Sequence, residues 1–198
     1  MRRPVRKSTA ARPSSGANRL RIIGGRWRGR PLEFPDVAAV RPTADRVRET
    51  LFNWLQAHVL GARCLDLYAG SGALGIEALS RGAAHVTFVD RDSRLGAHIA
   101  ATLQRLGATS AEVVVDEAQR FLRRTPQPFD IVFLDPPFGA EDLQQVLAAL
   151  DRGWLAEQAW VYLERAAHDG LPALPPGWSE HRSGRAGQVG YHLLRVAR

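Results

Sequence analysis

The sequence has little of what secreted and membrane proteins contain. Its 198 residues include one cysteine, Cys64, so an internal disulfide is excluded and a reducing compartment is expected. No apolar run approaches the roughly 20 residues that cross a bilayer. No apolar segment follows the basic N-terminus, as it would in a signal peptide. The six histidines show no metal-ligand spacing. We therefore expect a cytoplasmic protein without a membrane span or a metal site.

Acidic residues are absent from the first 30 positions, which hold ten of the 27 basic residues. The remaining 17 basic residues stand against 20 acidic ones, so the rest of the chain carries a formal charge of −3. The basicity belongs to an N-terminal arm, and such an arm suits a polyanion because each neutralised phosphate releases counterions. Residues 1–19 are rich in Ser, Ala and Pro, and we expect them to form a disordered basic tail.

Two elements are expected in residues 20–58. The segment "RLRIIGGRWRGRPLEF" alternates arginines with apolar residues around Gly-Gly, which predicts a β-hairpin that displays guanidinium groups to RNA. A helix is predicted after Pro42, with Val47, Leu51, Trp54 and Leu55 on one apolar face and its arginines on other faces. The candidate RNA-binding residues of this region are Arg26, Arg28, Arg30, Arg41, Arg46 and Arg48.

From residue 59 onward, short apolar runs alternate with helical patterns. Strands are predicted at 63–68, 85–90, 111–115, 129–134 and 160–164, and helices at 72–81, 93–106, 117–124 and 141–151. This spacing predicts right-handed crossovers and a parallel sheet covered on both faces. Two further strands, near 178–182 and 189–196, predict an antiparallel hairpin at the sheet edge. We expect one α/β domain, residues 20–198, with its core in 59–198.

The first crossover contains the clearest ligand signal. In "LDLYAGSGALGIEAL", Asp66 lies in the strand, and Gly70, Gly72 and Gly75 follow, so a ligand can approach the backbone and the helix N-terminus. The same glycine spacing satisfies the dinucleotide fingerprint, so NAD binding has to be weighed.

Two more acids end the next two strands, Asp90 in "VTFVD" and Asp116 after "EVVV". The carboxyl ends of parallel strands meet at one sheet edge, where open α/β sheets bind ligands. Either acid alone could cap the helix that follows it. Three acids in a row favour a binding site.

The strand "FDIVFLDPPF" ends in a carboxylate, two prolines and an aromatic ring. With the glycine loop and the acids, it resembles the (Asp/Asn)-Pro-Pro-(Phe/Tyr) element of class I S-adenosylmethionine-dependent methyltransferases that act on nucleobase amino groups. More narrowly, "RIIGGRWRGRPL", "RPTADRVRETLFNWL", "LDLYAGSGALGIEALSRGA" and "GQVGYHLL" resemble the RsmD family of small-subunit ribosomal RNA guanine-N2 methyltransferases. The likeness runs from about residue 20 to the C-terminus. Tyr68 departs from it mildly, because Phe is common there.

The resemblance implies a Rossmann-like class I methyltransferase fold with S-adenosyl-L-methionine as cofactor. It implies methylation of the N2 amino group of guanine 966 in 16S ribosomal RNA. The substrate implied is the assembled 30S small subunit rather than free RNA, and a chain this small fits a substrate whose shape does much of the selecting. We expect the protein to be a monomer.

The implied catalytic element is Asp135, Pro136, Pro137 and Phe138. A base amino group is a poor nucleophile, because its lone pair is delocalised into the ring. The Asp135 carboxylate and the Pro136 carbonyl can accept its two hydrogens and direct the lone pair, and the prolines fix both acceptors in advance. Phe138 offers a flat face for stacking, worth about 1–3 kcal/mol per base.

The implied cofactor site follows the strand ends. Asp66 and the loop 68–72 would hold the methionine part, Asp90 the ribose hydroxyls, and Asp116 the adenine amino group. Residues 41–43 would lie either over the methionine end or against RNA. The candidate cofactor-binding residues are Asp66, Tyr68, Ala69, Gly70, Ser71, Gly72, Asp90, Arg91, Asp116, Glu117 and Ala118.

Three other functions remain open from the sequence. An NAD-dependent oxidoreductase would use the glycine fingerprint, but nothing else in the chain supplies a hydride-transfer acid or a substrate lobe. A non-catalytic RNA-binding assembly factor would not need residues 135–138 intact. A DNA methyltransferase acting on adenine N6 or cytosine N4 would use the same Asp-Pro-Pro-Phe element.

Overall fold

The computed structural model describes residues 18–34, 45–137 and 143–197 of the chain. Most of the expected basic tail, residues 1–17, therefore lies outside the described residues. The same holds for Arg41 and Phe138 of the candidate site.

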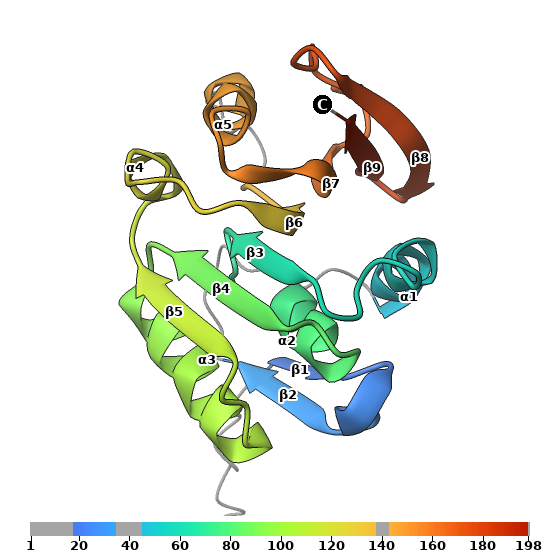
Figure 1. Ribbon diagram of the computed structural model, residues 1–198. Coiled ribbons are helices and arrows are strands. Elements are labelled where there is room, and N and C mark those ends of the chain that lie inside the picture. Colours follow the sequence, from blue (N-terminus) through green and yellow to red (C-terminus); the bar gives the residue numbers. More distant parts are fainter. Residues whose placement is uncertain (1–17, 35–44, 138–142, 198) are drawn as a thin grey trace, which may run out of the picture.

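A seven-stranded sheet forms the centre of the molecule, in the order β5-β4-β3-β6-β7-β9-β8 (Figure 1). The strands are β3 (Arg63–Leu67), β4 (His85–Asp90), β5 (Ala111–Val115), β6 (Phe129–Leu134), β7 (Leu155–Ala166), β8 (Trp178–Ala186) and β9 (Val189–Ala197). The first five are parallel, and β9 is antiparallel to both β7 and β8. The predicted α/β fold with an antiparallel C-terminal hairpin is confirmed.

Three predicted element lengths were wrong. The strand predicted near 178–182 is β8, which extends to Ala186 because β9 pairs with it from Trp178 to Ala186. The strand predicted at 160–164 extends over residues 155–166, because β9 pairs with it from Gln158 to Ala166 and satisfies its backbone beyond the apolar run. The helix predicted at 117–124 is only α4 (Ala118–Phe121), and the chain turns at Leu122 toward β6.

Five α-helices of the described chain cover the two faces of the sheet. They are α1 (Asp45–Trp54), α2 (Ala73–Ser80), α3 (Ser93–Leu106), α4 and α5 (Leu143–Leu150). The first three share one hydrophobic core with the sheet, and α4 and α5 share a second core on the opposite face (Figure 1). None of these helices is long and apolar enough to pass through a bilayer.

The central strands are buried on both faces, as their continuous apolar runs predict. Cys64 in β3 is fully buried, and burial raises the pKa of its thiol. Its sulfur is therefore a packing group and not an available nucleophile.

An N-terminal hairpin packs beside the core, as predicted. Strands β1 (Asn18–Arg21) and β2 (Pro31–Phe34) are antiparallel. The connection is not a tight Gly-Gly turn. It is a longer hairpin loop, residues 22–30, that contains the 3₁₀ turn η1 (Gly25–Trp27). Ile22, Leu32 and Trp27 are buried and fix the hairpin against the first core.

Helix α1 covers the parallel-to-antiparallel junction of the sheet. Val47, Leu51 and Leu55 are buried and Trp54 is half-buried against the same core, which confirms the predicted apolar face. Phe52 is buried as well, with its ring centroid 6.0 Å from that of Phe133 in β6. The helix is thereby held against the strand that precedes Asp135.

Candidate active site

The strand order predicts a ligand crevice between β3 and β6. From β3 the chain builds outward through β4 to β5, and then returns across the sheet to form β6 on the other side of β3. Open α/β sheets bind ligands at such a reversal, beyond the carboxyl ends of the strands. The glycine loop (residues 68–72) follows β3 and Asp135 follows β6, so both stand at this crevice.

The glycine loop is bent sharply at the end of β3. Tyr68 has a φ of 95° and is the one described non-glycine residue with a positive φ, while Gly70 and Gly72 have φ of 53° and 74°. The N–H groups of Tyr68 and Ala69 both donate to the Val89 carbonyl, at 3.0 and 2.9 Å. Strain of this kind is typical of functional sites and persists only when the surroundings hold it in place.

Gly75, the third glycine of the fingerprint, has a packing role. A Cβ atom there would lie 2.3 Å from the Phe88 ring in β4. Its N–H donates to Oδ2 of Asp66 at 2.9 Å. The close approach of α2 to the sheet accounts for this glycine without a cofactor contact.

Asp66 lies under the glycine loop, almost completely buried. Burial raises its pKa from the ordinary 3.8 to about 7, although the Gly75 N–H lowers it, and the charge of Asp90 adds a smaller rise. The folded protein therefore favours the protonated acid at mildly acidic pH.

The raised pKa of Asp66 predicts a pH-dependent stability. A folded-state pKa above the unfolded value contributes stability that is complete below about pH 4 and is lost as the pH rises through about 7. The loss between pH 5 and 8 is on the order of 3 kcal/mol. The Tm for thermal unfolding should fall as the pH rises across this range. Asp66→Asn can still accept the Gly75 N–H, and its Tm should depend less on pH. Parallel curves for both proteins would contradict the assignment.

Asp90 ties the glycine loop to the end of β4. Its Oδ2 accepts the Gly70 N–H at 2.8 Å and its Oδ1 accepts the Asp92 N–H at 2.8 Å. Asp92 in turn caps α3 by accepting the Arg94 N–H at 2.8 Å. One carboxylate thus orders two neighbouring loops of the binding edge.

Asp116 directly follows β5 and lies beside Asp90, and its N–H donates to the Asp90 carbonyl at 3.0 Å. Its buried carboxylate accepts the Glu117 N–H at 2.9 Å and forms ion pairs with Arg120 and Arg124. The Arg120 hydrogen bond is the main reason that the pKa of Asp116 lies below its ordinary value. These two ion pairs were not predicted from the sequence.

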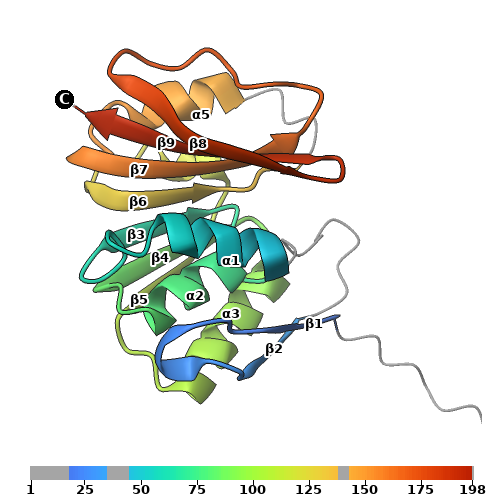
Figure 2. The same ribbon diagram turned by 90° about the vertical axis from the view of Figure 1, so that its right-hand side faces the viewer.

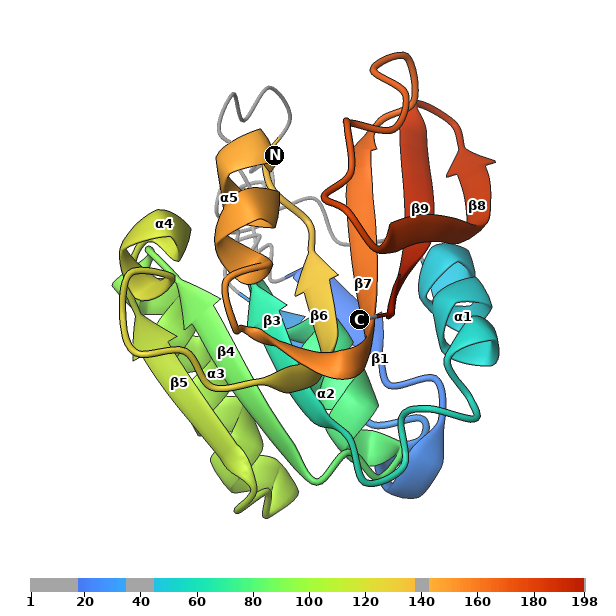
Figure 3. The ribbon, with the colours of Figure 1, turned by 45° about the horizontal axis from the view of Figure 1, so that its top comes forward.

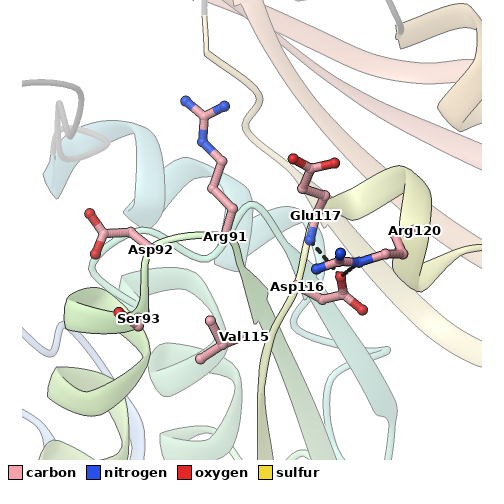
Figure 4. A pocket seen from close by; sticks show the side chains of 7 residues that line it. All are labelled: Arg91, Asp92, Ser93, Val115, Asp116, Glu117 and Arg120. Carbon is pink, nitrogen blue, oxygen red and sulfur yellow. Dashed lines mark hydrogen bonds and ion pairs between the residues drawn. The ribbon is translucent and has the colours of Figure 1, made fainter.

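A pocket of about 500 Å³ opens between the ends of β4 and β5. Arg91, Asp92 and Ser93 stand on one side, and Asp116, Glu117 and Arg120 on the other, with Val115 between them (Figure 4). Val115 is 49% exposed and gives the pocket apolar surface. Val115 is the one apolar residue of the lining, and the carboxylates of Asp92, Asp116 and Glu117 offer hydrogen-bond acceptors around it.

Asp135 and Pro136 leave β6 at the neighbouring strand end. Asp135 is half-buried, Pro136 is buried and Pro137 is exposed. The pairing of Asp66 with Phe133 in β6 puts the candidate catalytic residues Asp135 and Pro136 directly beside the strand that precedes the glycine loop. Among the described residues, no group of three His, Cys, Asp or Glu side chains could hold a metal ion.

The prediction that Arg48 contacts RNA was wrong, because its side chain is completely buried. One guanidinium nitrogen donates to the Arg21 carbonyl at 2.8 Å and to Asp45 at 2.6 Å. The other lies 3.9 Å from the buried Glu77 carboxylate. Arg48 thus compensates an acid inside the core. Arg26, Arg28, Arg30 and Arg46 are exposed.

Two residues of α2 that the sequence analysis missed, Glu77 and Ser80, hold the hairpin loop. The Glu77 carboxylate accepts the N–H groups of Ile23 and Gly24 at 2.8 and 2.7 Å. The Ser80 hydroxyl accepts the Trp27 N–H at 3.0 Å and donates to the Gly24 carbonyl at 2.6 Å. A charged residue inside the apolar helix "ALGIEALS" was the one available signal.

The hairpin loop therefore docks at the C-terminal end of α2, whereas the glycine loop precedes its N-terminal end (Figure 2). Eight helical residues span about 12 Å, so the arginines of the loop stand well away from the strand ends. Any polyanion that touches both has to run along this face of the protein.

The strand order, the strained glycine loop and the row of acids define a Rossmann-like methyltransferase of class I. The chain belongs to the family described as "Conserved hypothetical protein 95", whose model matches residues 20–195. This confirms the resemblance drawn from the sequence motifs.

Proteins with similar sequences or structures are named as methyltransferases. Ribosomal RNA small subunit methyltransferase D of Escherichia coli strain K12 is 49% identical over 182 residues, covering 91% of this chain and 92% of that protein. The Haemophilus influenzae protein of the same name is 42% identical, covering 89% and 93%. The solved structure of Escherichia coli yhhF matches with a TM-score of 0.85 at 45% identity, covering 91% of this chain and 99% of the other.

Proposed function

We propose that the protein transfers a methyl group from S-adenosyl-L-methionine to the N2 amino group of guanine 966 of 16S ribosomal RNA. The observation that carries the proposal is the position of Asp135 and Pro136 at the crevice, across from the glycine loop. The names of the relatives support ribosomal RNA as substrate. The proposed setting is the cytoplasm, with a monomer acting on the assembled 30S subunit.

The described residues fit the cofactor. Its adenine would suit the pocket beside Val115, which Asp116 and Glu117 line. Ala118 follows them as the first residue of α4. Asp116 keeps acceptor capacity beside its two arginines, because a carboxylate offers about four lone-pair sites. Asp90 and Arg91 are proposed to meet the ribose, and Asp66 with the glycine loop to meet the methionine part. In support, Asp90 accepts the Gly70 N–H of the loop and Asp66 accepts the Gly75 N–H behind it. When bound, the cofactor supplies a strongly electrophilic methyl group.

The residues of this chain bind the amino group through hydrogen bonds and orient its lone pair. Asp135 and the Pro136 carbonyl accept its two hydrogens, which frees the lone pair from conjugation and directs it toward the cofactor. The prolines fix both acceptors before the base arrives, so alignment supplies much of the rate. After transfer the amino group sheds one proton, to Asp135 or to water. Phe138, outside the described residues, is proposed to stack on the flipped base.

Replacing Asp90 with alanine should mainly weaken cofactor binding. The change removes the proposed ribose acceptor and also releases the Gly70 and Asp92 N–H groups. We expect S-adenosylhomocysteine to bind about 10²-fold more weakly, since each hydrogen bond to a charged group contributes about 1.5–3 kcal/mol. Turnover at saturating cofactor should stay within a few-fold. Calorimetric binding and steady-state kinetics separate the two, and an effect confined to turnover would rule out the ribose assignment.

The exposed arginines of the hairpin loop are proposed to contact RNA phosphates. Changing Arg26, Arg28 and Arg30 to glutamine should weaken binding to purified small subunits. The log–log salt slope should fall by about 0.7–0.9 for each phosphate that the variant no longer neutralises. Cofactor affinity should not change, because the loop docks at the far end of α2.

A matched control replaces Arg123, Arg152 and Arg195, three exposed arginines elsewhere, and makes the same change in net charge. Deletion of residues 1–18 is the second comparison and should matter less than the loop triple, because we expect this basic tail to contribute only screened attraction. An equal slope in the loop triple and the control triple would exclude the hairpin loop as the RNA contact.

The proposed function is tested with small subunits from cells that lack the gene. Purified protein and labelled cofactor are added, and the RNA is digested to nucleosides and identified by mass. N2-methylguanosine supports the proposal, whereas N6-methyladenosine or N4-methylcytidine would assign another base. Binding of S-adenosylhomocysteine and not NAD excludes the oxidoreductase, and cofactor binding without any methylated product would favour an assembly factor.

A further inference from the structure

A second carboxylate stands beside Asp135 at the edge of the crevice. Strands β6 and β7 run side by side toward this edge (Figure 3). Leu134 of β6 is paired with Leu163 of β7. The next residues of the two strands are Asp135 and Glu164. Neighbouring strands lie about 4.8 Å apart, and paired residues of parallel strands face the same side of a sheet. The residue before a proline is held extended, so Asp135 keeps this alternation beyond the last strand pair.

Glu164 is buried, with 5% of its surface exposed. Its Oε1 accepts the Tyr162 hydroxyl at 2.7 Å, from the same face of β7. Burial first, and then the charges of Glu164 and Asp135, raise the pKa of Tyr162 well above its ordinary value. Tyr162, Glu164 and Asp135 thus share one neighbourhood at the ends of β6 and β7.

A buried carboxylate is costly to desolvate, so its position calls for a reason. The hydrogen-bonding edges of the bases supply one. In guanine, the ring position next to the amino group is N1–H, a donor, whereas in adenine and cytosine the corresponding ring nitrogen is an acceptor. An ionised carboxylate only accepts hydrogen bonds. Two adjacent carboxylates can therefore accept both the N1–H and the N2 amino group of guanine. In adenine and cytosine, one carboxylate would face the lone pair of a ring nitrogen and be repelled.

We propose that Glu164 is the residue that selects guanine, accepting its N1–H while Asp135 and the Pro136 carbonyl hold its N2 amino group. This inference rests on the proposed function, and it names the part of the site that chooses the base. Tyr162 is the positioning residue, because its hydroxyl fixes the Glu164 carboxylate at the strand end. A site built around a hydrogen bond to its substrate rejects the analogue that lacks the partner, because a buried acceptor is left opposite another acceptor.

The test compares two bases at the methylated position of a reconstituted small subunit, guanine and 2-aminopurine. The second base keeps the amino group but has an acceptor at N1. We expect the wild-type protein to prefer guanine by at least about 10²-fold in kcat/KM. Glu164→Gln can donate to the 2-aminopurine N1, so its preference should fall toward one. Its S-adenosylhomocysteine affinity should equal that of the wild type.

A merely structural role of Glu164 would lower both rates equally and leave the ratio unchanged, which overturns the inference. If Glu164→Gln does not fold, the wild-type ratio of kcat/KM for guanine to that for 2-aminopurine is the test by itself. A ratio near one would contradict the inference. Tyr162→Phe should lower the ratio less than Glu164→Gln, and a larger effect would also contradict the assignment. Absence of methylated guanine with the wild-type protein is a failure of the proposed function. Methylated guanine with an unaltered ratio is a failure of this inference alone.

Discussion

Replacing Asp135 with alanine is expected to lower methyl transfer to small subunits by about 10²–10⁴-fold, the loss typical of a group that handles a proton in the transition state. The variant keeps the Pro136 carbonyl but can no longer grip both hydrogens of the amino group. S-adenosylhomocysteine affinity should stay within a few-fold of the wild type, because the residues proposed to hold the cofactor lie at the ends of β3, β4 and β5 and in the loops that follow them. Single-turnover methylation and calorimetric cofactor binding measure the two effects separately.

Asp135→Asn is the matched control for this change. It keeps one acceptor oxygen in nearly the same place and removes the negative charge. We expect an activity between those of the wild type and the alanine variant, because the (Asp/Asn)-Pro-Pro-(Phe/Tyr) element accommodates either residue. Both variants should unfold at temperatures close to the wild type, since Asp135 is only half-buried. Alanine activity within a few-fold of the wild type would remove Asp135 from the mechanism.

Replacing Gly25 with alanine should release the hairpin loop from the body of the protein. Gly25 has a φ of 73°, and a Cβ atom there would lie 1.9 Å from the Ser80 carbonyl oxygen and 2.7 Å from the Arg81 nitrogen. These are backbone atoms at the end of α2, so they cannot move aside. Loss of docking breaks the bonds that Glu77 and Ser80 make to the loop. Small-subunit affinity should fall by at least about tenfold, which corresponds to about 1.4 kcal/mol.

Gly29→Ala provides the comparison within the same loop. Gly29 also has a positive φ, 81°, but a Cβ atom there meets nothing within 4 Å. Both variants carry the backbone strain of about 1–2 kcal/mol, and only Gly25→Ala carries the clash. Limited proteolysis within residues 22–30 should be faster for Gly25→Ala than for Gly29→Ala. Measurements of small-subunit and cofactor affinity for the two variants complete the comparison. Equal behaviour of the two variants would show that docking by Glu77 and Ser80 does not position the RNA contact.

The core and the binding edge were predictable because local patterns determine them. Apolar runs of strand length predicted β3 to β6, and helical spacing predicted α2 and α3 to within a residue. Chain connectivity places the carboxyl ends of parallel strands at one edge, so Asp66, Asp90 and Asp116 could be grouped before any coordinates. The Asp-Pro-Pro-Phe element carries its own backbone restriction, which made the candidate catalytic residues recognisable.

Partners far apart in the chain were not predictable in this way. The hydrogen bonds of Glu77 reach residues more than 50 positions away, and Arg48 enters the core to meet the same acid. A charged residue in a helix usually faces water, so the pattern around Arg48 indicated an RNA contact that the fold excludes. Similarly, Glu164 acquires its place beside Asp135 only through the pairing of β6 with β7.

The sequence by itself determined the α/β class, the order of acids along the strand ends, and the rigid Asp-Pro-Pro element, because each depends on neighbours within a few residues. The tertiary structure decided which charges face solvent and which are buried in pairs. It also set the hairpin loop at the remote end of α2 and a second carboxylate next to the first. Those arrangements depend on desolvation and strand register, and both arise only when distant segments pack together.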